Sequence, residues 1–304
     1  MYNGVVNFFT HFEKENKTMK KFLALLLALT MALSLIACGS TETAETATPT
    51  EAATEAATEA PVEETEAPVE ETEAPAVSYQ ADIPEEDVIS YADYAAAEVD
   101  TLVTIETIIQ AKQSWWNDQA TFYTQDADGA YFIYNMPCSQ EEYEQMSVGT
   151  KIRVSGYKSE WAGEVEIVDA QFQILESEDT YYETLDITEM LGEDLLPYQN
   201  QMIFLKEATV VACNDAGDAF MYGWDGSGEP GTDADLYFTV AVGEETMTLV
   251  VEYYLCDSDG NYGEYTDFYK TVQGLSVGDK LDIHAFLYWY EGAQPHVSGI
   301  MCVG

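Results

Sequence analysis

One short pattern occurs twice in this chain, and it constrains the fold more than any other feature. Residues 146–152 read MSVGTKI and residues 275–281 read LSVGDKL, at an offset of 129 residues. A short helix is predicted just before each copy and a strand within or after it, so the same succession of elements is present twice. A repeated succession of elements with its own apolar positions predicts two similar domains, each with its own core.

The first copy contains five predicted strands, at 99–110, 120–125, 130–136, 151–157 and 164–175. Apolar and polar residues alternate along these segments, as they do in half-buried strands. Residues 126–129 (DADG) supply a hairpin turn between the second and third strands. Ser139 and Glu142 have the spacing of a capping box, which predicts a helix to about Met146. Similar spacing at Ser90 predicts another short helix before the first strand.

The second copy repeats this order with longer loops. Strands are predicted at 202–211, 235–242 and 246–255, a helix at about 266–272, and another helix at 186–192. Five strands with a helix between the third and fourth is the order of an OB-fold, a small Greek-key barrel. We therefore predict a mainly β protein with two tandem OB-fold-like five-stranded barrels, at 88–177 and 178–304. The alternative is an immunoglobulin-like sandwich, which lacks this helix.

The segment from Met19 to Cys38 has the parts of a secretory signal: two lysines, an uncharged apolar run and small residues before a cysteine. The apolar run is shorter than the ~20 residues of a membrane-spanning helix. We expect Met19 to be the true start and residues 1–37 to be removed as a signal peptide. Residues 38–87 are predicted to form a disordered linker, because repeats of TEAPVEE give it many glutamates and few apolar side chains.

Two segments resemble known bacterial sequences. Residues 35–38 resemble the lipobox of bacterial lipoproteins, and residues 148–157 (VGTKIRVSGY) resemble the fourth strand of bacterial OB-fold domains. From Val88 onward the chain resembles the tandem OB-like surface lipoproteins of Gram-positive bacteria, a largely uncharacterised group. The resemblance implies a lipid on Cys38 and anchoring on the extracytoplasmic face of the cell membrane. We also expect a monomer.

The chain is strongly acidic. It has 56 acidic and 11 basic side chains, a formal net charge of −45 at pH 7. Because nucleic-acid affinity depends on lysine and arginine at the phosphates, this charge predicts that nucleic acid is not a partner and that any ligand is neutral or cationic. The four cysteines after Cys38 lack the CxxC spacing of zinc sites. We expect buried free thiols, with Cys213–Cys302 as the one pairing to test.

Aromatic residues gather in the two loops that OB-folds use for ligands, between strands one and two and between strands four and five. All five tryptophans are predicted to lie in these loops, where an exposed ring could stack on the face of a sugar. In the alternative interpretation, the rings close the barrel ends as part of the core. The candidate ligand-binding residues are Trp115, Trp116, Tyr157, Trp161, Trp224, Tyr288, Trp289 and His296.

An acidic loop is a weaker candidate for a metal site. Asp257, Asp259, Asn261 and Glu264 have the oxygen density of a calcium loop, but they depart from the EF-hand pattern. The alternative is a solvated turn. We expect no cofactor, with calcium as the only candidate.

Catalysis is not predicted. His284 is expected on a strand face and His296 in a loop near Trp289, and no nucleophile motif accompanies either. The predicted function is a non-catalytic binding module, for glycans or cell-wall fragments. One alternative is a structural or adhesin-like surface protein that binds other proteins. Another is a cation-dependent or carboxylate-based hydrolase.

Overall fold

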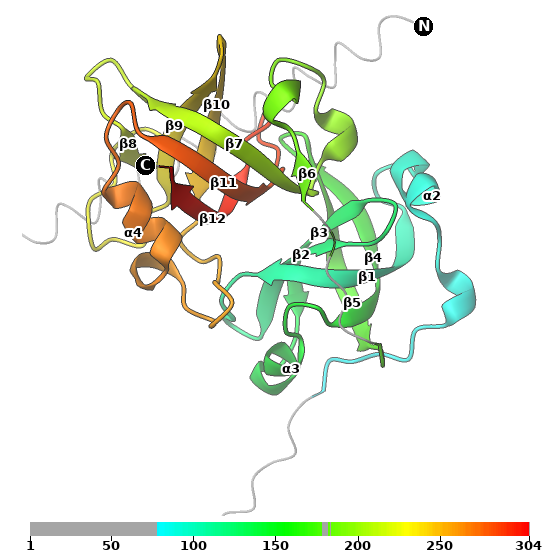
Figure 1. The fold of residues 1–304 in the computed structure, drawn as a ribbon. Helices are drawn as coiled ribbons and strands as arrows, with labels where there is room; N and C mark the ends of the chain where they lie inside the picture. The colour runs from blue at the N-terminus through cyan, green and yellow to red at the C-terminus, as the bar shows by residue number, and fades with distance from the viewer. Residues whose placement is uncertain (1–77, 178–181, 183, 304) are drawn as a thin grey trace, which may run out of the picture. The chain divides into compact units, whose positions relative to one another are not determined.

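The computed structural model of the chain describes residues 78–177, 182 and 184–303. The predicted signal peptide, Cys38 and the linker up to residue 77 lie outside these residues. Those that are described belong to one compact unit, which spans Glu70–Gly304. They form two OB-fold-like barrels with few helices, so the predicted fold class is confirmed (Figure 1).

Five strands close the first barrel. They are β1 (Leu102–Lys112), β2 (Gln119–Gln125), β3 (Ala130–Pro137), β4 (Lys151–Trp161) and β5 (Glu164–Ile174). Their order in the sheet is β1-β2-β3-β5-β4, and antiparallel pairing of β1 with β4 closes the ring. The third and fifth strands pair in parallel, which is the Greek-key crossover of the OB-fold.

The second barrel has the same topology. Its strands are β7 (Met202–Val211), β9 (Leu236–Val242), β10 (Glu245–Val251), β11 (Lys280–Phe286) and β12 (His296–Cys302). Because β7 pairs with both β9 and β11, the ring runs β7-β9-β10-β12-β11, with β10 and β12 parallel. Two short strands extend this sheet, β6 (Leu185–Asp186) beside β7 and β8 (Phe220–Tyr222) beside β9.

The repeated motif makes the same turn in both barrels. Gly149 and Gly278 have φ values of +93° and +101°, a conformation that glycine adopts without steric penalty. The Gly149 N–H donates to the Ile109 carbonyl at 2.8 Å, and the Gly278 N–H donates to the Val210 carbonyl at 2.9 Å. The motif thus ties the start of each fourth strand to the first strand of its barrel.

Each barrel has a short helix between its third and fourth strands, as predicted: α3 (Gln140–Gln145) and α4 (Asp267–Gln273). The capping box of α3 is present, since the Glu142 N–H donates to Ser139 Oγ and the Ser139 N–H donates to the Glu142 carboxylate. The other helical segments are α2 (Tyr91–Ala96), capped by Ser90, and the 3-10 turns η1 (Glu85–Asp87), η2 (Thr188–Met190), η3 (Leu196–Tyr198) and η4 (Gly263–Tyr265).

The helix predicted at 186–192 is wrong. Asp186 ends β6, and its carboxylate accepts a hydrogen bond from the Thr188 N–H at 2.9 Å, which favours a turn over a helix. Only the three residues of η2 are helical before Leu191 enters the core. Several strand ends also differ from the prediction, and β1 begins at Leu102 rather than at residue 99. Strand β4 continues to Trp161, and β10 ends at Val251.

Each barrel has its own apolar core, and a third cluster joins the two. This cluster combines side chains from both barrels, and we call the contact around it the seam: Ala111, Tyr123, Phe132, Leu255, Phe286 and Tyr288. Backbone hydrogen bonds also cross the seam, such as those from the Ser114 N–H to the Tyr254 carbonyl at 2.8 Å and from the Glu291 N–H to the Ala162 carbonyl at 2.7 Å. The two barrels are therefore packed against each other.

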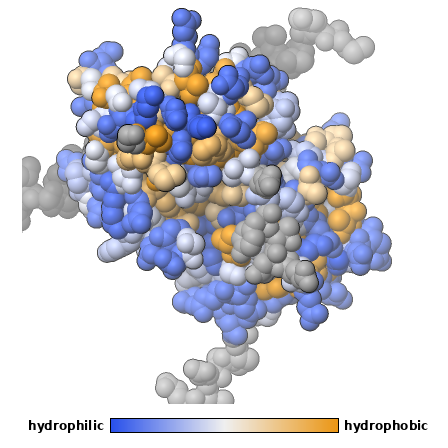
Figure 2. All heavy atoms as spheres, in the orientation of Figure 1, coloured by the Kyte–Doolittle hydropathy of each residue, from blue (hydrophilic) through white to orange (hydrophobic). Residues whose placement is uncertain are grey.

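The described cysteines all have free thiols, so the Cys213–Cys302 disulfide is not formed. The expectation that these thiols are buried is correct for Cys138 and wrong for Cys302, which is exposed. Among the helices in the described ranges, none is long and apolar enough to cross a membrane. Hydrophilic residues cover most of the face shown in Figure 2, with apolar residues in small groups between them.

Candidate functional site

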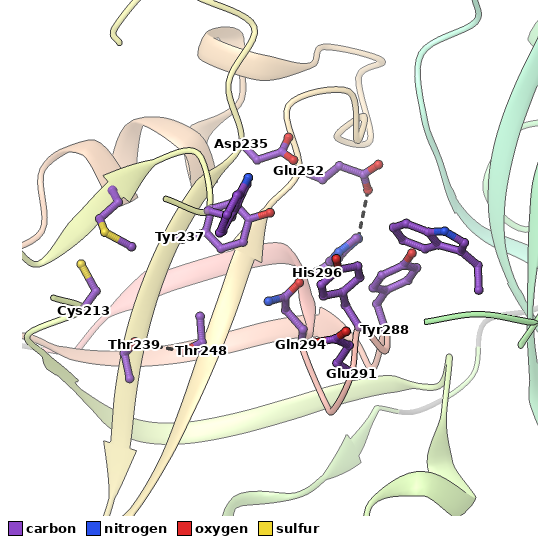
Figure 3. Close-up of a pocket in the computed structure, with 14 residues that line it drawn as sticks. Cys213, Asp235, Tyr237, Thr239, Thr248, Glu252, Tyr288, Glu291, Gln294 and His296 are labelled. Carbon is purple, nitrogen blue, oxygen red and sulfur yellow. Dashed lines mark hydrogen bonds and ion pairs between the residues drawn. The ribbon is translucent and has the colours of Figure 1, made fainter. Parts of the chain in front are cut away.

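A pocket of about 710 Å³ lies on the outer face of the second barrel (Figure 3). Strands β9 and β10 contribute Tyr237, Thr239 and Thr248, which alternate with core residues and therefore face outward. The loop after β8 contributes Trp224, and the loop between β11 and β12 contributes Tyr290. OB-folds bind oligonucleotides and oligosaccharides on the face of strands two and three. The loop between strands one and two and the loop between strands four and five flank that face.

Exposed aromatic rings surround this pocket. Trp161, at the end of β4, is the one contribution of the first barrel, and its ring centroid lies 5.2 Å from that of Tyr290. The exposed fractions are 56% for Trp161, 76% for Trp224 and 43% for Tyr290. Covering such a ring with a flat apolar surface removes both surfaces from water, which is favourable. The pocket therefore offers stacking faces to a ligand.

A buried polar network that crosses the seam adjoins these rings. His296 Nδ1 lies 2.6 Å from Tyr123 Oη and 3.2 Å from the Glu252 carboxylate. Tyr123 Oη donates to Glu252 at 2.9 Å, and the Gln113 amide donates to the other oxygen of that carboxylate. The Tyr288 ring stacks on the imidazole, with centroids 4.1 Å apart. Both hydrogen bonds that the imidazole makes with the described residues involve Nδ1.

Asp235 brings a second carboxylate to the same end of the pocket as Glu252 (Figure 3). Asp235 Oδ1 accepts a hydrogen bond from the Tyr253 N–H at 2.7 Å, whereas Oδ2 has no partner among the described residues. Burial raises the pKa of Asp235; the Tyr253 N–H opposes this rise, and the Glu252 charge adds to it. Within the described ranges, no lysine or arginine lines the pocket.

A third carboxyl group, Glu164, is fully buried where the two barrels meet. Its Oε2 accepts hydrogen bonds from the Trp289 N–H at 2.9 Å and from the Gln199 amide at 3.4 Å. Burial raises the pKa of Glu164 to about 8, so the group holds a proton near neutral pH. These contacts fix the loop that carries Tyr290 to the first barrel.

Four of the eight predicted ligand-binding residues meet at this pocket: Trp161, Trp224, Tyr288 and His296. Two of them are not where the sequence placed them. Trp161 ends β4, and His296 is the first residue of β12 rather than part of a loop. His296 and Tyr288 are each only 9% exposed. These two side chains therefore expose little surface to the pocket, and most of its aromatic surface comes from the exposed rings.

Trp115 and Trp116 line a second pocket, of about 340 Å³, together with Tyr254 and Tyr262. The two tryptophans are unequal. Trp116 is 70% exposed, whereas Trp115 packs against the first core and donates its Nε1–H to the Cys138 carbonyl at 2.9 Å. Trp115 is therefore partly buried against the first core and also lines the second pocket.

The last two candidates lie apart from the main pocket. Trp289 packs against the second core, and a Cβ atom on Gly163 would meet its ring at 2.8 Å. The Trp289 side chain is thus held near Gly163, and it also lines a separate pocket of about 350 Å³ with Leu191 and Thr246. Tyr157 is 45% exposed on β4 and does not line the pocket.

Asp235, Tyr237 and Glu252 were missed by the sequence analysis. Residue Leu236 pairs with Val251 across the β9–β10 hairpin, so the two acids that flank the hairpin stand opposite each other. An acidic residue just before the first strand of a hairpin and another just after its second strand are expected to be neighbours across the sheet. Tyr237 follows as the first outward residue of its strand. The sequence contained this pattern, but with 56 acidic residues in the chain it could not be distinguished from chance.

The residues that the structure describes contain no group of three or more His, Cys, Asp or Glu side chains that could hold a metal ion. At the predicted calcium loop, Asp257 Oδ1 accepts hydrogen bonds from the Asp259 and Asn261 N–H groups, each at 2.9 Å. The Asp257 carboxylate therefore closes a turn of its own loop.

The His296–Glu252 pair resembles an oriented base, but it has no activated nucleophile. Its one hydroxyl partner among the described residues is Tyr123, and burial raises the pKa of that phenol. His284 is exposed on β11, beside Phe204 and outside the pocket. The lining side chains offer hydrogen-bonding groups, carboxylates and ring faces to a ligand.

No family model matches the chain, and no curated protein matches it. Among solved structures it is similar to the Ifi202 HINa domain in complex with 20-bp double-stranded DNA, with 12% identity, 68% of this chain and 96% of that chain covered, and a TM-score of 0.28. A murine DNA-binding protein bound with double-stranded DNA has 9% identity, 66% and 96% coverage, and a TM-score of 0.30. The hypothetical protein ygiW from E. coli has 19% identity, 32% and 100% coverage, and a TM-score of 0.22.

The prediction that nucleic acid is excluded as a partner is wrong. HIN domains are OB-fold domains, and some are described in complex with double-stranded DNA. Net charge is a sum over the whole chain, whereas phosphate contacts depend on local side chains. A charge of −45 therefore does not decide what one surface of an OB-fold binds, and the exclusion is withdrawn.

Proposed function

We propose that the protein is a lipid-anchored, extracytoplasmic binding module that holds a glycan or cell-wall fragment on its second barrel. One observation carries the proposal: the pocket occupies strands two and three and the two flanking loops, the general ligand position of the OB-fold. Trp161, Trp224 and Tyr290 would stack on sugar faces. No step requires catalysis, because binding uses hydrogen bonds and ring faces alone.

Binding can be measured by isothermal titration of the purified full chain with an N-acetylglucosamine tetramer and with a soluble peptidoglycan fragment. Stacking on an aromatic ring in OB-type sites is worth ~1–3 kcal/mol. Trp224→Ala and Trp161→Ala should therefore each weaken binding by about fivefold or more. Both rings are exposed, so these changes should leave the melting temperature unchanged.

Trp116→Ala is the matched control. It removes an equally exposed ring that does not line this pocket. Binding that is insensitive to Trp161→Ala and Trp224→Ala, or equally sensitive to Trp116→Ala, would contradict the proposed site.

The proposed anchoring rests on the signal segment, Cys38 and the acidic linker, in that order along the chain. Replacing Cys38 by serine should move the protein from the membrane fraction to the medium. Cys302→Ser, which changes an exposed thiol in the second barrel, is the control. Unchanged membrane retention of the Cys38→Ser variant would refute lipid anchoring.

A further inference from the structure

The charges in the main pocket indicate a chemical class of ligand. Three carboxylates line it, those of Asp235, Glu252 and Glu291. The ion pairs of lysine and arginine found in the described ranges are made elsewhere, by Lys151, Arg153 and Lys270. His296 is thus the one lining side chain, among those described, that can become cationic. The pocket is a negative, partly enclosed volume.

Asp235 has fewer hydrogen-bond partners than Glu252, the acid that stands beside it. One N–H satisfies Oδ1, and Oδ2 has no hydrogen-bond partner among the described residues. By contrast, Glu252 accepts hydrogen bonds from the Tyr123 hydroxyl, the His296 imidazole and the Gln113 amide. A half-buried carboxylate without a countercharge interacts strongly with a cation, because less water screens the pair.

Aromatic faces complete the same environment. Tyr237 stands two residues after Asp235 on the outward face of β9, and the Trp161 and Tyr290 rings contact each other at the loop between β11 and β12. Faces of tryptophan and tyrosine attract ammonium groups through the ring quadrupole. Three lining carboxylates disfavour an anionic ligand in this pocket. A pocket that combines carboxylates with aromatic faces is therefore suited to a protonated amine.

We propose that this pocket binds the ammonium group of an amine-bearing ligand, with Asp235 Oδ2 as its ionic partner and the aromatic rings around it. This inference rests on the proposed function, in which the rest of the ligand is a glycan. An oligosaccharide of amino sugars with free amines would supply both the ammonium group and the sugar faces.

The test compares two sugars with the same backbone, one with free amines and one with those amines acetylated and therefore uncharged. A glucosamine tetramer and its fully N-acetylated form are titrated into the full chain at about pH 6, where amines are protonated, and at about 0.15 M salt to screen distant charges. Spermidine is a third probe, an amine without a sugar. The glucosamine tetramer should bind at least about tenfold more tightly than the acetylated form, which corresponds to about 1.4 kcal/mol.

Asp235→Asn should remove this preference while keeping the fold, because an asparagine Oδ1 can still accept from the Tyr253 N–H. Asp128→Asn makes the same charge change at an exposed turn of the first barrel and should leave the preference intact. If Asp128→Asn weakened binding as much as Asp235→Asn did, the attraction would be a general effect of net charge, and the inference would fail.

The outcomes separate the two proposals. Equal or tighter binding of the acetylated tetramer would overturn the ammonium site and leave the glycan proposal standing. Spermidine binding that depends on Asp235, without binding of either sugar, would support the ammonium site and overturn the glycan proposal. If none of the three probes bound, both would be overturned.

Discussion

Replacing Glu164 by glutamine should stabilise the protein at alkaline pH and leave its stability nearly unchanged at acid pH. Glu164 is fully buried, and its Oε1 has no hydrogen-bond partner, nor has Oδ1 of Asn200. Asn200 lies within hydrogen-bonding reach of Glu164. This contact lowers the pKa of the carboxyl group, but burial outweighs it. A glutamine is uncharged at every pH and keeps an acceptor for the Trp289 N–H.

The size of the effect follows from the pKa. Burial raises the pKa of Glu164 from its ordinary 4.5 to about 8, with a further rise from the Glu166 charge. Between these values the folded state keeps a proton that the unfolded state releases. The contribution of Glu164 to stability is therefore full below about pH 4.5 and is lost as pH rises towards 8. Each unit of pKa corresponds to 1.36 kcal/mol, so the total loss is on the order of 5 kcal/mol.

Urea unfolding of the wild-type chain and the Glu164→Gln variant at about pH 5 and pH 8 would measure this difference. The variant should match the wild type at the lower pH and exceed it by a few kcal/mol at the higher pH. Glu160→Gln, at an exposed position of β4, is the control and should show no such trend. A Glu164→Gln difference that stays constant across this range would refute the reasoning, because it would mean that the carboxyl group is ionised throughout.

Three further substitutions test the packing around the site. Gly163→Ala should destabilise the protein by about 1–3 kcal/mol in urea unfolding, because φ is +93° and the new Cβ would meet the Trp289 ring at 2.8 Å; an unchanged midpoint would show that the two barrels do not meet there. Trp115→Ala should cost about 2 kcal/mol or more, while Trp116→Ala should change the melting temperature little; equal effects would contradict the assignment of one ring to the core and the other to solvent. Tyr123→Phe should cost about 1–3 kcal/mol, since it removes the hydroxyl's hydrogen bond to the partly buried Glu252 carboxylate, and a neutral result in calorimetry would show that this hydrogen bond contributes nothing.

The candidate site could be predicted only in part. Tryptophans in the loops of an OB-fold pointed to Trp161 and Trp224, because loop position and residue type suffice to place an aromatic ring at a barrel mouth. The exposed fraction of each ring could not be predicted. Trp115 and Trp289 occupy equivalent loops, yet they pack against the cores and the seam. Whether a loop ring faces water depends on what the opposite barrel places over it.

The amino-acid sequence by itself determined the two barrels. Alternating apolar residues, a capping box at Ser139 and the two glycines at 149 and 278 act over a few neighbouring residues, so each can be recognised locally. The tertiary structure alone decided the seam and the pocket. Tyr123 and His296 are 173 residues apart in the chain, and they meet at 2.6 Å only because one barrel packs against the other. Contacts of this kind arise from the shape and burial of whole surfaces, which no local pattern encodes.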